Sequence, residues 1–166
     1  MASVQAIFDF KLQVIETPDM DQDLAPDPAI THEITGDSGD LSGSSAEPPI
    51  TKKFAGNVVL AAGAKTLDLT ALENGNLPNE TFDGLKVQIL KFKALPDNTN
   101  AVKIKKGGTN GYEFCGSGAP ECTLEKAGDV AMYKFNDSLA DVSSTVKNLD
   151  FSGTGSDGVK VILCAG

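Results

Sequence analysis

The sequence predicts an all-β fold, a jelly-roll or Greek-key β-sandwich with a long extended N-terminal arm or loop. Three observations lead to this fold class. Apolar and polar residues alternate with a period of two over most of the chain, whereas the spacing of an amphipathic helix is nearly absent. Turn signals that contain Gly, Asn or Asp separate these segments at short intervals. The 166 residues, 40% of them hydrophobic, suffice for one domain with a buried core.

Residues 1–50 are predicted to form an N-terminal strand followed by an extended polar arm. The strand is indicated by alternating apolar residues, which are Val4, Ala6, Phe8, Phe10, Leu12 and Val14. Residues 17–49 are rich in Pro, Gly, Ser and Asp, a composition that cannot bury enough apolar surface for a core of its own. We therefore expect an extended arm or long loop, in which Ala29, Ile30 and Ile34 contact a neighbouring subunit.

Residues 51–166 are predicted to form the β-sandwich core of the same single domain. Within 85–95 the apolar side switches between Ile89 and Leu90, which predicts a β-bulge or a strand buried on both faces. Residues 137–146 fit a short helical turn or an irregular crossover between sheets, and their Ser and Thr content favours the crossover. The segments with strand-like patterns are 58–60, 66–69, 85–95, 101–105, 112–115, 122–125, 130–135, 146–151 and 159–164.

The segment 159–164 is a strongly apolar strand candidate. Such a strand needs a place in the middle of a sheet or a covering neighbour, because a bare apolar edge invites aggregation. We therefore predict that Val159, Val161 and Leu163 take part in assembly contacts.

The charge of the chain restricts its partners. It holds 23 Asp and Glu residues against 14 basic residues, all of them Lys, for a net charge of -9. This balance argues against a broad basic surface for nucleic-acid phosphates. No stretch approaches the roughly 18 uninterrupted apolar residues of a membrane span, so we expect no membrane partner. The N-terminal residues lack the basic start and apolar core of a signal peptide, which predicts synthesis in the cytoplasm.

Cysteines and acidic residues offer two candidate sites. Cys115 and Cys122 flank a turn-rich segment, so they fit either a disulfide across a hairpin or two reduced cysteines that act as small hydrophobic side chains. Asp19, Asp21 and Asp23 follow the opening of a calcium loop, although the Gly and the Glu of an EF-hand are missing further on. These three carboxylates fit either a Ca²⁺ site completed by other ligands or a solvated acidic loop.

Two short motifs resemble catalytic or phosphate-binding loops, but the residues around them do not fit these functions. Residues 36–39 read Gly-Asp-Ser-Gly as in a serine protease, but the only His, His32, lies in the same polar arm and not in a separate part of the fold. Residues 107–111 are Gly-rich like a phosphate loop, but a strand candidate follows them where a helix would be needed. We therefore predict a protein without catalytic activity and without an obligatory cofactor.

The N-terminal strand and the polar arm are followed by strand-like segments separated by glycines. Examples are TLDLTAL (66–72), GLKVQ (84–88), GTNGY (108–112) and LDFSGTGSDGVKVILCAG (149–166). This order and texture resemble small virion structural proteins of tailed bacteriophages over most of residues 51–166. The resemblance implies a non-enzymatic β-sandwich subunit, made in the host cytoplasm, that becomes part of the virion.

The resemblance favours a capsid decoration or cement protein. Such a subunit oligomerises with copies of itself, preferably as a trimer, on the major capsid protein or another virion protein. A tail-tube or fibre subunit is the alternative of the same class. From a different class, a carbohydrate- or cell-surface-binding module assisted by Ca²⁺ also fits the sequence.

Overall fold

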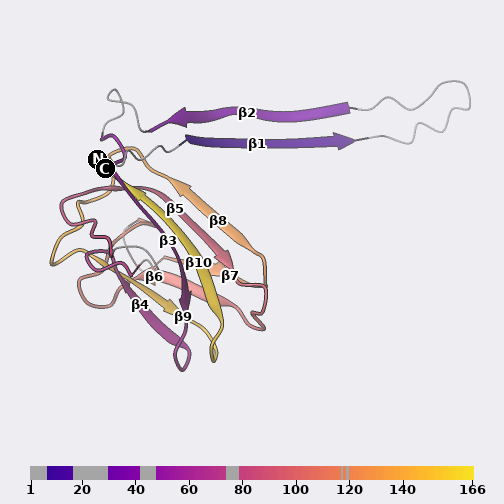
Figure 1. Ribbon diagram of the computed structural model, residues 1–166. Coiled ribbons are helices and arrows are strands. Elements are labelled where there is room, and N and C mark those ends of the chain that lie inside the picture. Colours follow the sequence, from indigo (N-terminus) through magenta and orange to yellow (C-terminus); the bar gives the residue numbers. More distant parts are fainter. Residues whose placement is uncertain (1–6, 17–29, 42–47, 74–78, 117, 119) are drawn as a thin grey trace, which may run out of the picture.

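A computed structural model describes residues 7–16, 30–41, 48–73, 79–116, 118 and 120–166, and in these ranges the chain forms β-strands and no helix (Figure 1). The all-β prediction is therefore confirmed for the described residues. The strands are β1 (Ile7–Glu16), β2 (Ile30–Asp40), β3 (Lys52–Val59), β4 (Ala64–Asp68), β5 (Val87–Ala94), β6 (Val102–Lys106), β7 (Glu121–Leu124), β8 (Val130–Lys134), β9 (Asn148–Ser152) and β10 (Gly158–Ala165).

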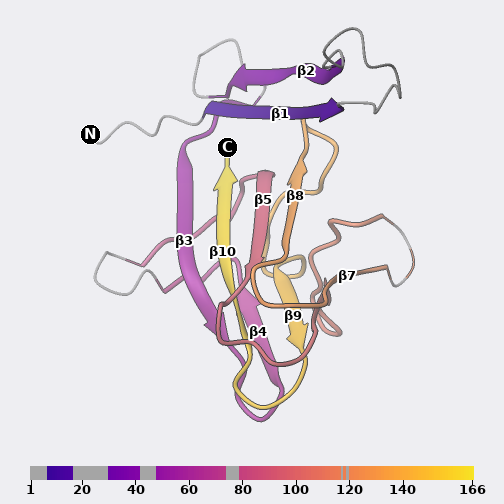
Figure 2. The same ribbon diagram turned by 90° about the vertical axis from the view of Figure 1, so that its right-hand side faces the viewer.

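The strands from β3 to β10 form two antiparallel four-stranded sheets. Sheet 1 has the order β3-β10-β5-β8, and sheet 2 has the order β4-β9-β6-β7. Figure 2 shows sheet 1 nearly face on, with its four strands side by side. Consecutive strands change sheet at every connection except the one between β6 and β7, which pair with each other. The two sheets are thus linked by connections that cross from one to the other.

The core lies between the two sheets and is built by the alternation seen in the sequence. In β10, for example, Val159 and Val161 are fully buried while Lys160 between them is exposed. The ring of Phe92 in sheet 1 makes edge contacts with Phe151 of sheet 2, at 6.0 Å between centroids, and with Phe114 at 5.7 Å. Side chains from both sheets therefore interlock in one core.

Sheet 1 is organised around β10, which lies between β3 and β5. The predicted place of this apolar strand in the middle of a sheet is confirmed. The β-bulge predicted within 85–95 is also present. It lies just before Ile89, whereas the apolar pattern placed the change of side between Ile89 and Leu90. Ala165 pairs with Val87 and Cys164 pairs with Ile89, so Gln88 is the extra residue of a β-bulge that moves the inward side from Val87 to Leu90.

The strands β1 and β2 form a separate two-stranded antiparallel sheet. The sequence pattern predicted a strand in this region and a polar arm after it, but it missed the strand β2. In Figures 1 and 2 this hairpin lies across one end of the sandwich, and in Figure 1 it extends beyond the sheets. The hairpin is joined to the sandwich where the backbone amide of Ile50 donates to the carbonyl of Leu41 at 2.8 Å.

Two segments that connect strands were assigned from local sequence patterns, and the structure differs from one assignment and agrees with the other. Residues 112–115, predicted as a strand, form no strand, because Tyr112 is instead inserted whole into the core. Its hydroxyl donates to the carbonyl of Ala140 at 3.0 Å and accepts from the amide of Val87 at 3.2 Å. Residues 137–146 form the predicted crossover, since they lead from β8 in sheet 1 to β9 in sheet 2 without helical structure.

Candidate assembly surface

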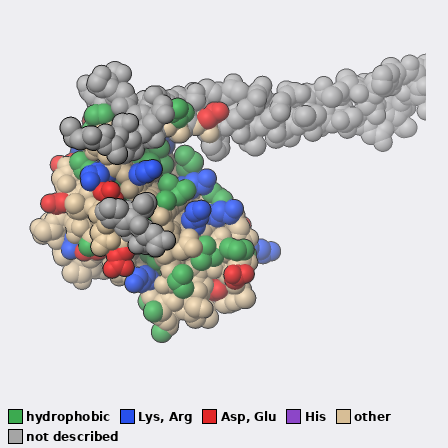
Figure 3. All heavy atoms as spheres, in the orientation of Figure 1, with side chains coloured by type: hydrophobic (Ala, Val, Ile, Leu, Met, Phe, Trp, Pro, Cys, Tyr) green, Lys and Arg blue, Asp and Glu red, His purple; other side chains and the backbone are tan. Residues whose placement is uncertain are grey.

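The outward side of sheet 1 carries lysine and apolar side chains, and the described strands of this sheet contain no Asp or Glu. Directly paired residues point to the same side of an antiparallel sheet, so the registers define this surface, which we call the lysine face. Figure 3 shows lysine and hydrophobic side chains intermixed where β5 and β8 lie in Figure 1. The lysine face consists of Lys53, Ala55, Asn57, Val59, Ile89, Lys91, Lys93, Val130, Met132, Lys134, Lys160, Ile162 and Cys164.

Lysines are crowded at the centre of this face. Lys93 of β5 and Lys160 of β10 are directly opposite each other across the two strands. Like charges in directly opposed positions destabilise a sheet. Within the described part of the chain, Lys53, Lys91, Lys93 and Lys160 form no salt bridge that would offset this repulsion. The face is therefore electrostatically complementary to an acidic surface.

The same face presents exposed apolar side chains. Val59, Val130 and Met132 are 47%, 52% and 42% exposed, and all three belong to the lysine face. The remaining large hydrophobic side chain that is exposed among the described residues is Ile7 of β1, at 66%. Neighbouring exposed apolar side chains such as Val130 and Met132, two residues apart on β8, can contribute to a surface for association. Exposed apolar area therefore occurs on sheet 1 and on the hairpin.

One end of the lysine face is covered by the chain itself. Ile50 is buried against Ile89, and Leu41 and Cys164 pack onto this pair. This small cluster lies at the end of sheet 1 next to the hairpin. The part of the face around Lys93 has no such cover from the described residues and is open.

The structure corrects the assembly contacts predicted in β10. Val159, Val161 and Leu163 have no exposed surface, because they point between the two sheets and fill the core. They are therefore not available to another subunit. The sequence misled because β10 has apolar residues on both sides, and alternation alone does not tell which side faces the core. The side chains of β10 on the outward side are Lys160, Ile162 and Cys164.

Two of the three assembly contacts predicted in the arm, Ile30 and Ile34, lie in β2. Ile30 pairs with Glu16 and Ile34 pairs with Leu12 in the register of the hairpin. Ala29 lies outside the described residues. The backbone of the hairpin thus places Ile30 and Ile34 in a strand and not in an irregular loop.

The predicted acidic metal site falls outside the described residues, which leave out Asp19, Asp21 and Asp23. Where the structure does describe the chain, no three His, Cys, Asp or Glu residues come together in a way that could hold a metal ion. The Ca²⁺ site therefore remains a prediction from the sequence.

Cys115 and Cys122, the pair considered for a disulfide, are free thiols in this structure. Both thiols interact with the hydroxyl of Tyr133. The ring of Tyr133 makes an edge contact with the ring of Phe114, at 5.7 Å between centroids. Burial raises the pKa of both thiols above the ordinary value, although the Tyr133 hydroxyl acts in the opposite direction. A raised pKa leaves less thiolate at neutral pH, so neither thiol is activated as a nucleophile.

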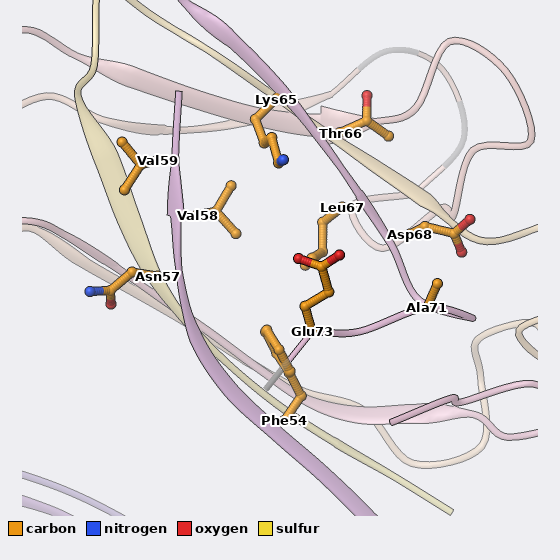
Figure 4. Close-up of a pocket in the computed structure, with 10 residues that line it drawn as sticks. All are labelled: Phe54, Asn57, Val58, Val59, Lys65, Thr66, Leu67, Asp68, Ala71 and Glu73. Atoms are coloured by element: carbon orange, nitrogen blue, oxygen red, sulfur yellow. The ribbon is translucent and has the colours of Figure 1, made fainter. Parts of the chain in front are cut away.

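A pocket of about 370 Å³ opens between the edge strands of the two sheets, β3 and β4. In Figure 4 the side chains of Val58 and Leu67 approach each other from the two strands, and the carboxylate of Glu73 lies between Leu67 and Phe54. Two polar members are already engaged, since the Thr66 hydroxyl donates to Asp150 at 2.6 Å and Asp68 accepts from Lys147 at 2.6 Å. The lining of the pocket thus mixes apolar side chains with polar and charged ones.

The outward side of sheet 2 differs from the lysine face because it carries acidic side chains, and these have partners within the chain. Lys103 of β6 donates to Glu121 of β7 at 2.6 Å. Asp150 of β9 accepts from Thr66 of β4 and from the backbone amide of Gly108 at 2.8 Å. Together with Asp68, which accepts from Lys147, all three acidic side chains in the strands of sheet 2 therefore have partners within the chain.

Comparisons of the chain with protein-family models, curated proteins and solved structures find no match. None of the described segments forms a helix with the length and apolar character needed to cross a membrane. The lysine face is the site that sequence reasoning missed. A signal for it exists in the sequence, because the segments 52–59, 87–94, 130–134 and 158–165 hold six lysines and no acidic residue in a chain of net charge -9.

Proposed function

We propose that this chain is a non-enzymatic structural subunit of a virion, and that it decorates a capsid as a homo-oligomer, preferably a trimer. The observation that carries the proposal is the lysine face, where Lys91 and Lys93, which form no salt bridge with a described residue, share one side of a sheet with the exposed Val130 and Met132. A surface of this kind is suited to burial against another protein. The resemblance of residues 51–166 to small virion proteins of tailed phages supports the same role.

We also propose that the sandwich is a jelly roll and that residues 1–50 act as its assembly arm. The strand orders β3-β10-β5-β8 and β4-β9-β6-β7 support a jelly roll, because connections that alternate between two four-stranded sheets are its arrangement. Jelly rolls are frequent in viral capsid proteins. A fold of this kind hosts several functions, so it supports the proposal without deciding it.

The test is the state of the purified chain in solution. Light scattering coupled to size exclusion is expected to give an oligomer, and a trimer of the 17.3 kDa chain has a mass of about 52 kDa. Electron microscopy of particles from the source is expected to show the protein on the shell. A chain that stays monomeric at all concentrations and binds no capsid would contradict the proposal. Long tubes or fibres in place of discrete oligomers would replace capsid decoration by the tail-tube or fibre role.

A second candidate function is a carbohydrate- or cell-surface-binding module. The pocket between β3 and β4 favours it, since Glu73, Asn57 and Lys65 offer hydrogen-bonding groups beside an apolar lining. A glycan array and a thermal shift with Ca²⁺ test this role. Stabilisation by a glycan that Glu73→Ala abolishes would support it, because a ligand bound only to the folded state raises its melting temperature.

A further inference from the structure

The negative charge of this chain is concentrated in one region. Residues 7–40 contain nine Asp or Glu residues and one Lys, a net charge of -8 out of the -9 of the whole chain. Within the paired strands themselves, β1 and β2 contain five acidic residues against one lysine. The hairpin is therefore acidic, whereas the four strands of sheet 1 contain only basic charges.

The hairpin also has no supporting surface of its own in the described part of the chain. β1 pairs only with β2, and neither strand joins sheet 1 or sheet 2. An isolated two-stranded hairpin is marginally stable in water and needs a further strand or a packing surface. In Figure 1 the hairpin runs away from the sandwich and does not lie down on the lysine face of its own chain. Another molecule can supply such a surface.

The two surfaces match in apolar character as well as in charge. The large exposed hydrophobic side chains among the described residues are Ile7 on the hairpin and Val59, Val130 and Met132 on the lysine face. A contact between the two surfaces can bury Ile7 together with the neighbouring Val130 and Met132 of β8. It would also bring carboxylates to Lys93 and Lys160, which are directly opposite each other and form no salt bridge with a described residue.

We propose that the acidic β1–β2 hairpin of one copy of this chain docks on the lysine face of a second copy. The contact joins two different surfaces, so each copy offers one hairpin and one face, and repetition of the contact around an axis closes a ring such as a trimer. This inference rests on the proposed function, because it names the surfaces through which the structural subunit assembles with itself.

Charge reversal on each surface separately is the first part of the experiment. The face variant combines Lys93→Glu with Lys160→Glu, which exchanges one like-charged pair for another and so leaves the balance within sheet 1 similar. The hairpin variant combines Glu33→Lys with Asp40→Lys in β2, two positions that the β1–β2 register places on the Ile7 side of the hairpin. Each variant is expected to raise the dissociation constant of self-assembly roughly 10- to 100-fold, since close opposite charges become like charges.

A matched control keeps the net charge of the face variant and changes a different surface. Lys105→Glu with Lys126→Glu alters two exposed lysines outside the lysine face, neither of which forms a salt bridge with a described residue. This control is expected to change the dissociation constant by about threefold or less, because surface charges away from a contact act weakly through salt solution. Circular dichroism and thermal unfolding of every variant establish that the sandwich is folded.

Mixing the two reversed variants is the decisive part. The face variant carries two acidic surfaces and the hairpin variant carries two basic ones, so each hairpin is complementary to the face of the other variant. We expect each variant to be monomeric alone and the equimolar mixture to form assemblies in which the two variants alternate. The chain that carries all four substitutions is expected to recover self-assembly, because both surfaces have then changed sign.

The outcomes separate this inference from the proposed function. If the wild-type chain assembles and the reversed variants assemble as tightly, the docking of hairpin on face is wrong while a structural subunit stands. If the variants lose assembly but their mixture stays monomeric, the contact does not join two copies and the inference is overturned. If the wild-type chain itself is monomeric and binds no capsid, the proposed function fails and this inference falls with it.

Discussion

The outer faces of the two sheets are built from similar strands but differ in whether acidic side chains accompany their lysines. The strands of sheet 2 hold four lysines and three acidic residues, and its ion pairs and hydrogen bonds hold the charges within the chain. The strands of sheet 1 hold six lysines and no acidic residue. The acidic groups of sheet 2 therefore have partners within the chain, whereas Lys53, Lys91, Lys93 and Lys160 on the lysine face form no salt bridge with a described residue.

The comparison assumes that both sheets unfold together as one cooperative unit. A substitution in the core that they share tests this assumption and is expected to have the largest effect. Phe92→Ala removes a ring that packs on Phe114 and Phe151 from across the sandwich. We expect one unfolding transition that is destabilised by about 3–5 kcal/mol, the usual cost of such a cavity. Urea unfolding followed by two optical probes measures it. Two separate transitions would show that the sheets unfold independently.

Removing an acidic group from sheet 2 is expected to have the next largest effect. The carboxylate of Asp68 accepts from the amide and hydroxyl of Thr70, at 2.8 and 2.6 Å, and from the ammonium group of Lys147 at 2.6 Å. Asp68→Ala leaves these donors unsatisfied and is expected to cost about 1–3 kcal/mol in the free energy of unfolding. Glu125→Ala on the exposed loop after β7 is the control and is expected to change stability very little. An equal effect of the two substitutions would contradict the paired character of sheet 2.

The pH dependence of stability sharpens the same contrast. Partial burial raises the pKa of Asp68, but its hydrogen bonds with Lys147 and Thr70 outweigh this and hold the pKa below the ordinary value of 3.8. A carboxyl group with a lowered pKa stabilises the fold above its unfolded pKa, and this contribution is lost as the pH falls through the folded pKa. The stability difference between wild type and Asp68→Asn is therefore expected to be largest near pH 7 and to shrink below pH 3.8. A difference that does not vary with pH would rule out this linkage.

The smallest expected effect has the opposite sign. Lys93→Gln in sheet 1 removes one member of the like-charged pair with Lys160. We expect a gain of a few tenths of a kcal/mol for the monomer, together with weaker self-assembly. Chemical unfolding of a dilute, monomeric sample measures the gain. Loss of stability on this substitution would mean that the lysine is already satisfied within its own chain.

The sandwich was largely predictable because its strands follow a simple alternation. The segment 130–135 was expected and β8 spans Val130–Lys134, and 159–164 was expected where β10 spans Gly158–Ala165. The segment 112–115 has the same local pattern but forms no strand, since the bonds of the buried Tyr112 hydroxyl are made with Val87 and Ala140, far away in the sequence. The polar strand β2 was missed for a related reason, because it is specified by pairing with β1 and not by its own composition.

The candidate site was harder to predict than the fold. The sequence marks β10 as an important strand, but both of its sides are rich in apolar residues, and the assembly contacts were assigned to the buried side. The lysine face arises from four segments that are distant in sequence and adjacent only in the sheet. Sheet order decides which charges become neighbours, and no local pattern contains that order. What the sequence does contain is the segregation of acidic residues to 7–40.

The central place of β10 also determines when sheet 1 can form during synthesis. β3 and β5 do not pair with each other, so β3 has no partner in its sheet until β10, the last strand in chain order, has emerged from the ribosome. Pairing between strands so distant in sequence makes folding slow, on the order of milliseconds to seconds for sandwiches of this kind. Until then the apolar side of β3 is exposed in the nascent chain. We therefore expect the growing chain to depend on chaperones up to the moment when β10 inserts, after which the sheet closes in a single step.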